Sequence, residues 1–343
     1  MPAPLIIPYF IPHRGCPHQC IFCNQHLITS VSSESCQMPD LEATIEAYLG
    51  YKGARSRVEL AFFGGNFLGL PQSDILGLLR RVHPYMERGQ IHGVRCSTRP
   101  DTVTRKHLEL VAPLGMTLVE LGVQSMDDKV LKRAGRGHTR ADTVAAVDLL
   151  REKGIDVGVQ VMAGLPGDTS ATALESCRAL AAMKPDLARI YPVLVLAGSR
   201  LARWYEKGRY EPLALEQAVA QVADMWRIFS GAGVNVVRMG LQASEMMDDP
   251  SQVLAGPWHP AFGHLVYSEL MFEKVCGKMD LLLQGDANRS GRVLLCVHPK
   301  SVSRLQGNRK ENLDKLRRRF PEVKFLVRTS DGVHPDQISV EWD

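Results

Sequence analysis

The sequence lacks any apolar run close to the roughly 18–20 residues that a helix needs to cross a bilayer. Its start, Met1-Pro2-Ala3-Pro4, has neither the basic region nor the cleavage site of a secretory signal. The net charge of the 343 residues is only +4, which is too small to indicate a partner. With 45% apolar and 23% charged residues, the composition is typical of a globular protein. We therefore expect a cytoplasmic protein without a membrane span.

Cysteine is concentrated in one place, and no second C-x2-C pair occurs elsewhere in the chain. Cys16, Cys20 and Cys23 have the spacing C-x3-C-x2-C, so their three thiolates can converge on one metal centre within a single loop. The other five cysteines are scattered, and Cys36 alone lies close enough in sequence to be a further candidate. We expect these five to pack as small hydrophobic residues: Cys36, Cys96, Cys177, Cys276 and Cys296.

The missing second pair of cysteines narrows the choice of metal. Thiolates select zinc, copper(I) or an iron–sulfur cluster, and a structural zinc site is closed by four ligands, usually in two pairs. Three thiolates on a four-iron cube would instead leave the fourth iron open to a small molecule. The loop alone also permits a zinc site completed by His13, His18 or His26. A disulfide is the weaker interpretation, because a cytosolic C-x2-C more often serves metal or redox chemistry.

Short apolar segments alternate with segments of helical periodicity about six times between residues 5 and 191. The expected strands are residues 5–11, 58–63, 93–98, 117–123, 157–163 and 187–191, and the helices are residues 41–49, 73–85, 103–111, 127–133, 141–153 and 171–183. The strands are apolar and β-branched, as expected when both faces are buried. This alternation predicts parallel strands with right-handed crossovers, in an open doubly wound sheet or a barrel. In both, ligands bind at the carboxyl ends of the strands, where the cysteine loop falls.

The chain changes character after residue 192. Further helices are expected at residues 199–208, 215–229 and 264–275, and one more strand at residues 234–239. The order β-α-β-β is expected from residues 293–297, 310–320, 323–327 and 338–342. We therefore expect two domains, a core barrel with flanking helices in residues 1–270 and a small basic α+β unit in residues 280–343.

Positive charge gathers in the C-terminal part of the chain. Between Lys300 and Phe320 there are eight basic residues and two acidic ones, a difference of 8 − 2 = +6. The basic residues are Lys300, Arg304, Arg309, Lys310, Lys315, Arg317, Arg318 and Arg319. Such a segment is a candidate RNA footprint, with the backbone N–H groups of residues 307–310 available to a phosphate. The alternative is a solvated helix face with a basic last turn, and the scarcity of aromatic residues disfavours single-strand binding.

Six segments stand out in order along the chain: IPHRGCPHQCIFCNQ, AFFGGNFLGL, STRPD, VELGVQSMDDKVLKRAGRGHT, VQVMAGLPGDT and RIYPVLVLAGSRL. Together they resemble the radical S-adenosylmethionine (SAM) superfamily, and within it the radical-SAM half of the Elongator catalytic subunit. Their order and spacing also fit wider relatives, including oxygen-independent coproporphyrinogen oxidase. The resemblance covers about residues 5 to 270. It implies an α/β fold, a partial (βα)6 radical-SAM barrel, to which the small C-terminal α+β unit is added.

The resemblance implies that Cys16, Cys20 and Cys23 hold a 4Fe-4S cluster. In the superfamily the open iron binds the amino and carboxylate groups of SAM, and one electron from the cluster breaks a sulfur–carbon bond. The resulting 5'-deoxyadenosyl radical takes a hydrogen atom from a substrate, while the protein supplies position and shelter. An external donor such as flavodoxin or ferredoxin would deliver the electron.

The same resemblance assigns residues to SAM. Gly64 and Gly65 match the glycine pair that approaches the amino group, and Asn66 stands where relatives often carry Ser, Glu or Gly. Glycine after a strand lets the backbone approach a ligand closely or adopt a positive φ. Phe22, just before the third cysteine, would pack near the adenine.

Four more residues complete the implied SAM site. Gln124 and Arg136 match the positions that hold the carboxylate, for which the planar fork of arginine is suited. Ser97 and Gln160 match strand-end positions that contact the ribose hydroxyls and are acidic in some relatives. Taken alone, Gln124 could instead satisfy loop backbone, and Arg136 could be a surface charge in a basic run. No residue is assigned to hydrogen abstraction itself.

The substrate follows from the sequence only by analogy. RNA is the leading prediction, and we expect a radical SAM enzyme of tRNA modification that contacts tRNA through its basic C-terminal helix. A radical SAM enzyme acting on a small molecule of porphyrin type and a non-catalytic metal-binding protein are the alternatives. In Elongator's catalytic subunit an acetyltransferase domain follows the radical-SAM part. The residues beyond the resemblance here show no acetyl-CoA motif, so we do not expect this chain to acetylate by itself.

Overall fold

The computed structural model describes residues 4–11, 15–24, 40–51, 53, 55–241, 249, 251–284 and 289–343. The chain forms two compact units, Met1–Ala218 with Asp224–Pro260, and Val219–Ala223 with Ala261–Asp343. Three candidate ligands, His13, His26 and Cys36, lie outside the described residues. Of the helices that the structure describes, none is both long enough and apolar enough to cross a membrane.

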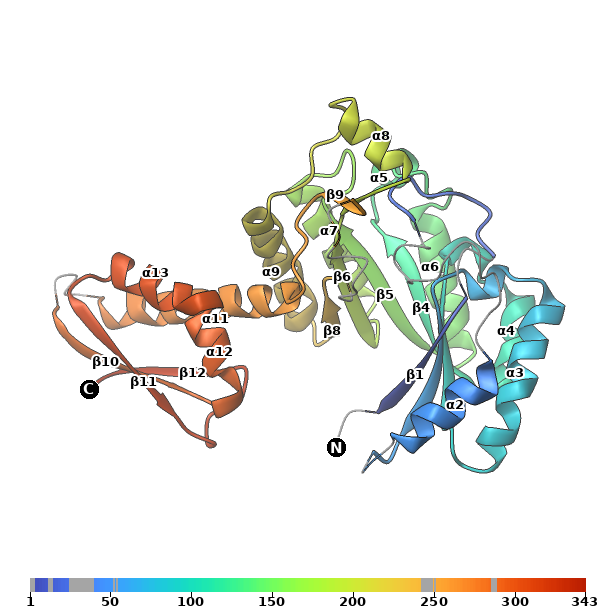
Figure 1. Ribbon diagram of the computed structural model, residues 1–343, viewed down its shortest axis with the longest axis horizontal. Coiled ribbons are helices and arrows are strands. Elements are labelled where there is room, and N and C mark those ends of the chain that lie inside the picture. Colours follow the sequence, from blue (N-terminus) through green and yellow to red (C-terminus); the bar gives the residue numbers. More distant parts are fainter. Residues whose placement is uncertain are drawn as a thin grey trace. The chain divides into compact units, whose positions relative to one another are not determined.

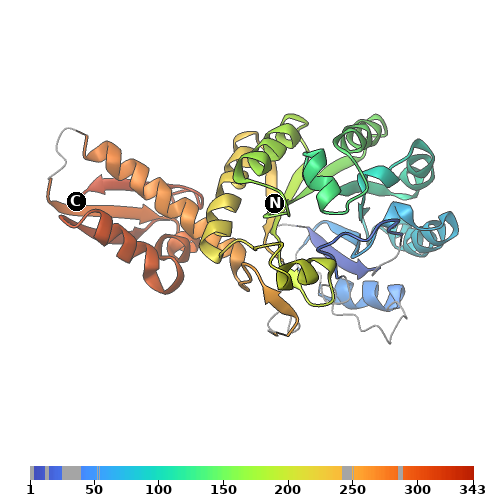
Figure 2. The same ribbon diagram turned by 90° about the horizontal axis from the view of Figure 1, so that it is seen from above.

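A parallel sheet of seven strands forms the first unit (Figure 1). Its order is β1-β2-β3-β4-β5-β6-β8, and every neighbouring pair is parallel. The strands are β1 (Leu5–Phe10), β2 (Val58–Phe63), β3 (Gly93–Thr98), β4 (Met116–Gln124), β5 (Asp156–Ala163), β6 (Leu187–Pro192) and β8 (Asn235–Met239). Figure 2 shows that this sheet curls into a half-barrel. The predicted partial barrel is therefore confirmed, and the segment expected at residues 234–239 adds a seventh strand.

Helices on the outer side of the curl connect these strands (Figure 2). They are α2 (Leu41–Gly50), α3 (Gln72–Glu87), α4 (Arg105–Val111), α5 (Asp128–Arg133), α6 (Arg140–Glu152) and α7 (Ser170–Ala182), followed after β6 by α8 (Arg200–Glu206) and α9 (Leu215–Gly231). Most begin at a polar cap, because a side-chain oxygen there satisfies free N–H groups of the first turn. Asp127 accepts from two amides of α5, and Thr139 forms a capping box with Asp142 at the start of α6.

The two faces of the sheet differ, because successive side chains of a strand point to opposite sides. Leu60, Val119 and Val159 on the outer face are buried beneath helices. The inner face instead carries polar residues, including Glu120 and Gln160, on neighbouring strands. The expectation of strands that are apolar on both faces is therefore wrong for the inner face, where charged side chains are buried because they are paired.

The second unit packs α11 (Phe262–Leu282), α12 (Val302–Gln306) and α13 (Glu311–Arg319) with a sheet of β10 (Gly291–Val297), β11 (Val323–Thr329) and β12 (Ile338–Trp342). The strand order is β11-β10-β12, in which β11 is parallel and β12 antiparallel to β10. The small α+β unit that we predicted for the C-terminal part is therefore present.

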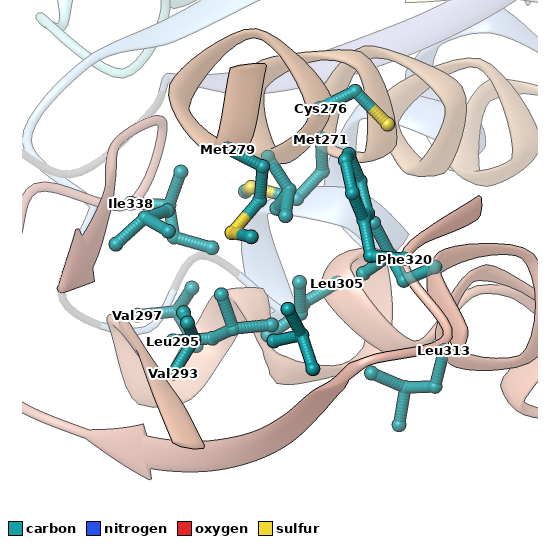
Figure 3. Packing of buried hydrophobic residues seen from close by; sticks show 14 residues of the cluster. Met271, Cys276, Met279, Val293, Leu295, Val297, Leu305, Leu313, Phe320 and Ile338 are labelled. Atoms are coloured by element: carbon teal, nitrogen blue, oxygen red, sulfur yellow. The ribbon is translucent and has the colours of Figure 1, made fainter. Parts of the chain in front are cut away.

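Helix α11 is longer than the residues 264–275 that the sequence predicts for it. Met271 and Met279 stand two helical turns apart on one side of the helix and are buried in the same cluster as Val293 of β10 (Figure 3). Because this apolar side packs with the C-terminal sheet, the whole of α11 belongs to the second unit, which consists of Val219–Ala223 and Ala261–Asp343.

Candidate functional site

The cysteine loop follows β1 and starts at the carboxyl edge of the parallel sheet. Its described part, residues 15–24, buries Cys20, leaves Cys16 exposed and leaves Cys23 half-buried. The amide of Cys23 donates to the carbonyl of Cys20 at 3.2 Å, which turns the chain between the second and third cysteines. The three predicted ligands therefore lie in one short, turned loop.

The thiols of this loop influence one another's ionisation. Burial, followed by the neighbouring Cys20 and Cys16, raises the pKa of Cys23 to about 12. Burial and then Cys20 likewise raise the pKa of Cys16. Cys16 and Cys23 are therefore protonated near neutral pH, and binding of iron would release their protons.

Within the described ranges, no three His, Cys, Asp or Glu side chains are arranged closely enough to hold a metal ion as they stand. The donor set nevertheless fits an iron–sulfur cluster, since three soft thiolates come from a single loop. His18, one of the alternative zinc ligands, packs its ring against Gly137, where a Cβ would come within 2.2 Å.

Two buried hydrogen-bond donors beside the cysteine loop also support binding of a cluster and SAM at this place. The Nε group of Arg136 and the Nη1 group of Arg99 are buried and have no hydrogen-bond partner in the part of the chain that the structure describes. Buried donors are normally bonded, and an anionic group at this place would satisfy them. Both the sulfurs of a cluster and the carboxylate of SAM are acceptors of that kind.

Segments that are distant in sequence hold the cysteine loop by hydrogen bonds. Ile21 donates its amide to the carbonyl of Ala134 at 3.1 Å and accepts from the amide of Leu201 at 2.7 Å. Asn24 donates its side-chain amide to the carbonyl of Ala197 at 2.7 Å. The course of the loop is therefore set by the end of α5 and by the chain that follows β6.

Asn66, just after β2, bonds the start of the loop to the next strand. Its side-chain nitrogen donates to the carbonyl of Gly15 at 2.6 Å. Its side-chain oxygen accepts from the hydroxyls of Thr98 at 2.6 Å and Thr102 at 2.8 Å, and from the amide of Arg99 at 2.9 Å. Asn66 is 1% exposed, so its side chain positions the loop. A contact of Asn66 with a cofactor would have to use its backbone.

Gly15 allows this close approach, and Gly64 turns the chain toward Asn66. Gly15 has φ +79°, and a Cβ there would lie 2.2 Å from the carbonyl oxygen of Asn66. Gly64 has φ +86° and turns the chain from β2 into Gly65 and Asn66. The predicted glycine pair therefore directly precedes Asn66, the residue that contacts Gly15 in the cysteine loop.

Arg136 makes the second connection between the loop and the sheet. Its Nη1 donates to the sulfur of Cys20 at 3.0 Å, and its Nη2 donates to the carbonyl of Gly122 on β4. The residue is only 6% exposed. The alternative that Arg136 is a surface charge is therefore wrong, because its guanidinium points inward at a predicted metal ligand.

Gln124 ends β4 in a left-handed conformation with φ +71°, which is uncommon for a residue other than glycine. The register between β4 and β5 shifts between Gly122 and Gln124, as at a β-bulge, and such shifts redirect side chains. The Oε1 of Gln124 accepts from Nε2 of Gln160 at 3.1 Å. A Cβ on Gly122 would lie 3.0 Å from Nε2 of Gln124 and 3.3 Å from Nη2 of Arg136. The structure thus brings Gln124, Arg136 and Gln160 together around Gly122.

The other two predicted contacts lie nearby. Ser97 is half-buried on β3, where it pairs in register with Glu120 of β4 on the inner face. Phe22 is half-buried and packs against a cluster that includes Ile21, Val130 and Leu165. Their contacts with the ribose and the adenine remain predictions.

Arg99 is a positioning residue to which sequence analysis assigned no role. Its guanidinium donates to both carboxylate oxygens of Asp101 at 2.9 Å and to the backbone carbonyl of Arg136. Burial raises the pKa of Asp101, but the hydrogen bonds and charge of Arg99 outweigh burial and lower it. The motif STRPD contains both residues, but nothing in it indicates that its arginine supports Arg136.

His138 is buried behind this site. It is 3% exposed, its Nε2 donates to the carbonyl of Val123 at 3.2 Å, and its Nδ1 has no hydrogen-bond partner among the described residues. Burial, and then the charges of Arg136 and Arg99, lower the pKa of His138 from 6.5 to about 3. Between these pH values the unfolded chain binds a proton that the folded chain does not, so the free energy of unfolding falls as the pH falls.

When the pH is lowered from 7 to 5.5, we expect His138 to lower the free energy of unfolding of the wild type by about 1 kcal/mol. The variant His138→Gln should not show this contribution. Glutamine keeps a side-chain N–H that can donate to Val123 but does not titrate. Urea unfolding at the two pH values measures the difference. Equal losses in the two proteins would contradict this prediction, because they would show that folding does not lower the pKa of His138.

The chain matches models of one family of cofactor-dependent enzymes over the half-barrel and beyond it. The radical SAM superfamily model matches residues 10–180, and the Radical_SAM C-terminal domain model matches residues 185–271. Members of this class are enzymes that use a 4Fe-4S cluster and SAM. The chain belongs to the radical SAM superfamily.

Curated relatives with similar sequences include proteins named tRNA uridine(34) acetyltransferase and Elongator complex protein 3. The tRNA uridine(34) acetyltransferase of Dehalococcoides mccartyi is 30% identical over 243 residues, which are 61% of this chain and 53% of that protein. Elongator complex protein 3 of Homo sapiens is 28% identical over 187 residues, 49% of this chain and 34% of the human protein. The chain therefore spans about half the length of the first relative and about a third of the second.

A solved structure supports the fold. The archaeal Methanocaldococcus infernus Elp3 with an N-terminal deletion matches with a TM-score of 0.64 and 22% sequence identity. The match covers 78% of this chain and 63% of that chain. At this level of identity the likeness shows the fold, and the arrangement of side chains has to be argued from this chain itself.

Proposed function

We propose that this chain cleaves SAM reductively at a 4Fe-4S cluster held by Cys16, Cys20 and Cys23, and that it acts in tRNA modification. The contact between Arg136 and Cys20 is the observation that carries the proposal. It joins the cysteine loop to the carboxyl end of β4, where Gln124 and Gln160 already meet. This supports a single site for the cluster and SAM, at the edge of a parallel sheet where ligands usually bind.

When bound, the cluster and SAM supply the electron and the 5'-deoxyadenosyl radical that takes a hydrogen atom from a substrate. Gln124 and Arg136 would hold the SAM carboxylate, because amide and guanidinium N–H groups donate to it. Gly64 and Gly65 would leave room for the amino group beside the loop. Flavodoxin or ferredoxin would deliver the electron.

The remaining predicted contacts concern the nucleoside part of SAM. Ser97 and Gln160 would bond the ribose hydroxyls, for which neutral side chains suffice. Phe22 would lie near the adenine, and Asn66 would contribute through its backbone. Asn66 and Arg99 would act on SAM indirectly, since both of their side chains are engaged in holding the loop and Arg136.

The experiment that tests cleavage uses protein reconstituted with iron and sulfide under anaerobic conditions. With dithionite and SAM we expect 5'-deoxyadenosine, measured by chromatography, and the electron paramagnetic resonance signal of a reduced four-iron cluster. Protein that keeps its iron but forms no 5'-deoxyadenosine would refute the proposal. Protein that retains zinc instead of iron would favour a metal-binding protein without radical chemistry.

tRNA is proposed as the substrate because some of the curated relatives are named for tRNA uridine(34) and because the second unit is basic. Some of this charge is paired within the unit: Arg317 with Asp314 at 2.8 Å, and Arg319 with Asp280 at 3.0 Å. The two arginine side chains are 62% and 50% exposed. Such pairs contribute little stability, so the arginines can exchange their carboxylates for phosphates.

Changing Arg317, Arg318 and Arg319 together to alanine is expected to weaken tRNA binding. Each lost phosphate contact should reduce the slope of log Kd against log salt by about 1. Filter binding at several salt concentrations measures this slope. Arg178→Ala on α7, which removes a similarly exposed arginine that is paired with Glu175, is the control. An unchanged slope in the triple variant would argue against the basic helix and favour a small-molecule substrate.

A further inference from the structure

A chain of buried ion pairs crosses the inner face of the half-barrel. Arg95 on β3 lies 3.3 Å from Glu59 of β2 and 3.0 Å from Glu120 of β4. The carboxylate oxygens of Glu120 also lie 2.5 Å from Nε and 3.1 Å from Nη2 of Arg189 on β6. Glu59, Arg95 and Glu120 are 6%, 7% and 4% exposed. Glu59 also pairs with Arg57, whose Nε lies 2.6 Å from a carboxylate oxygen of Glu59 and whose side chain is 55% exposed, so the connected network holds three arginines and two glutamates.

Strand β5 lies between β4 and β6, so the side chain of Arg189 must extend across β5 to pair with Glu120. A glycine of β5 leaves room for this. Gly158 of β5 pairs in register with Glu120 on one side and Leu187 on the other. A Cβ on Gly158 would lie 2.9 Å from Cγ of Glu120 and 2.8 Å from Cδ1 of Leu187. The missing side chain therefore leaves the space through which Arg189 reaches Glu120.

Arg189 also reaches side chains that are less deeply buried. Its Nη1 donates to the hydroxyl of Tyr191 at 3.2 Å, and its guanidinium carbon lies 5.1 Å from the ring centre of Phe63. The ring centre of Phe63 lies 6.2 Å from that of Phe10. All four residues are half-buried, unlike the ion pairs behind them. We call Arg189, Tyr191, Phe63 and Phe10 the inner-face cluster.

The inner-face cluster borders the proposed SAM site. Arg189 pairs in register with Gln160, whose side chain bonds to Gln124. Phe63 directly precedes Gly64. The cluster therefore lies on the side of the sheet, and close to the edge, where the radical would form.

We propose that the inner-face cluster binds the planar ring of the substrate nucleobase, a uracil if the substrate is tRNA uridine; this inference rests on the proposed function. Arg189 offers N–H donors, and the Tyr191 hydroxyl, which accepts from Arg189, can itself donate its O–H. Such donors suit the carbonyl oxygens at the edge of a pyrimidine. Phe63 and Phe10 offer rings against which a base can stack.

The charges around the inner-face cluster favour a neutral base over a phosphate as its ligand. Glu120 pairs with both Arg95 and Arg189, so the guanidinium of Arg189 already has a carboxylate partner where the cluster presents its hydrogen-bond donors. A phosphate entering here would bring its negative charge next to the buried carboxylate of Glu120, whereas a neutral ring would not. The phosphates of an RNA would have to be held elsewhere.

The experiment compares two anticodon stem-loop RNAs on the anaerobically reconstituted full chain. One carries uridine at position 34 and the other an abasic site there. Both have the same phosphates, so the ratio of their Kd values isolates the contribution of the base. For the wild type we expect the uridine RNA to bind roughly 5- to 150-fold more tightly, which is the range for stacking of one base.

Tyr191→Phe removes one hydroxyl and is expected to reduce this ratio about threefold to tenfold. Arg189→Lys keeps a positive charge beside Glu120 but loses the planar fork, and should reduce the ratio further. Tyr51→Phe removes a hydroxyl from a side chain that is 73% exposed, and is the matched control that should keep the wild-type ratio. Iron content and thermal unfolding show whether each variant is folded.

A wild-type ratio near one would overturn the inference. So would an unchanged ratio in Tyr191→Phe and Arg189→Lys, because a purely structural role would change the affinity for both RNAs equally. Formation of 5'-deoxyadenosine is measured on the same preparations. Its absence in the wild type would refute the proposed function, whereas an unchanged ratio in protein that forms 5'-deoxyadenosine refutes only the binding of a base.

Discussion

Replacing Cys20 with serine is expected to remove the iron and to reduce 5'-deoxyadenosine formation by more than about 100-fold. Loss of residues that only orient metal ligands already lowers metal affinity or activity by roughly 10- to 100-fold, and loss of a ligand itself should have a larger effect. Cys20 is the buried cysteine of the loop, and its sulfur accepts the hydrogen bond from Arg136. A hydroxyl is a poor ligand for a cluster that is normally held by thiolates. Iron analysis and the SAM cleavage assay measure both effects, and Cys16→Ser and Cys23→Ser should act in the same direction.

Cys296→Ser is the matched control for this prediction. Cys296 is half-buried on β10 in the second unit, so the same chemical change should leave iron content and SAM cleavage at the wild-type level. If Cys20→Ser kept a full complement of iron, the three cysteines of the loop could not be the ligands of the cluster.

Replacing Asn66 with alanine is expected to destabilise the first unit by about 2–4 kcal/mol, because buried polar groups lose their partners. The carbonyl of Gly15 would lose its donor, and the amide of Arg99 and the hydroxyl of Thr98 would lose their acceptor. Asn66→Asp is more specific. It keeps the acceptor for Arg99 and Thr98 but places a carboxylate oxygen against the carbonyl of Gly15. We expect both variants to take up less iron, since each releases the start of the cysteine loop.

Asn312→Ala separates the loss of the loop contact from general destabilisation. Asn312 is 3% exposed in the second unit and donates to the carbonyls of Ser268 at 2.8 Å and Arg304 at 3.2 Å. Its loss should also lower the free energy of unfolding, measured in urea, but should not reduce the uptake of iron. Normal iron uptake by Asn66→Ala would contradict the role that we assign to Asn66.

Much of the fold could be predicted because its signals are local. The alternation of apolar strands with helical segments predicts a parallel sheet, and the structure has that sheet with nearly the predicted strand limits. The end of α11 was missed. Of its residues after Val275, Cys276 and Met279 are buried in a cluster with a sheet that follows later in the chain, which periodicity within the helix does not reveal.

The charged inner face could not be predicted in the same way. Glu59, Arg95, Glu120 and Arg189 each stand in a short strand that otherwise looks buried. A charge in such a strand requires a partner, but the strand does not indicate which one. The partners become known only when the order and register of the strands place Arg95 between two carboxylates and Gly158 beside Glu120.

The sequence by itself determined the three-cysteine loop, the strand ends that surround it and the superfamily to which they point, because these depend on the spacing of neighbouring residues. Only the tertiary structure decided that Arg136 meets Cys20, 116 residues away, that Asn66 holds Gly15, and that Arg189 crosses β5 to reach Glu120. The physical reason is that buried polar groups are satisfied by whichever partner the packing of the sheet brings near, and that packing involves the whole chain.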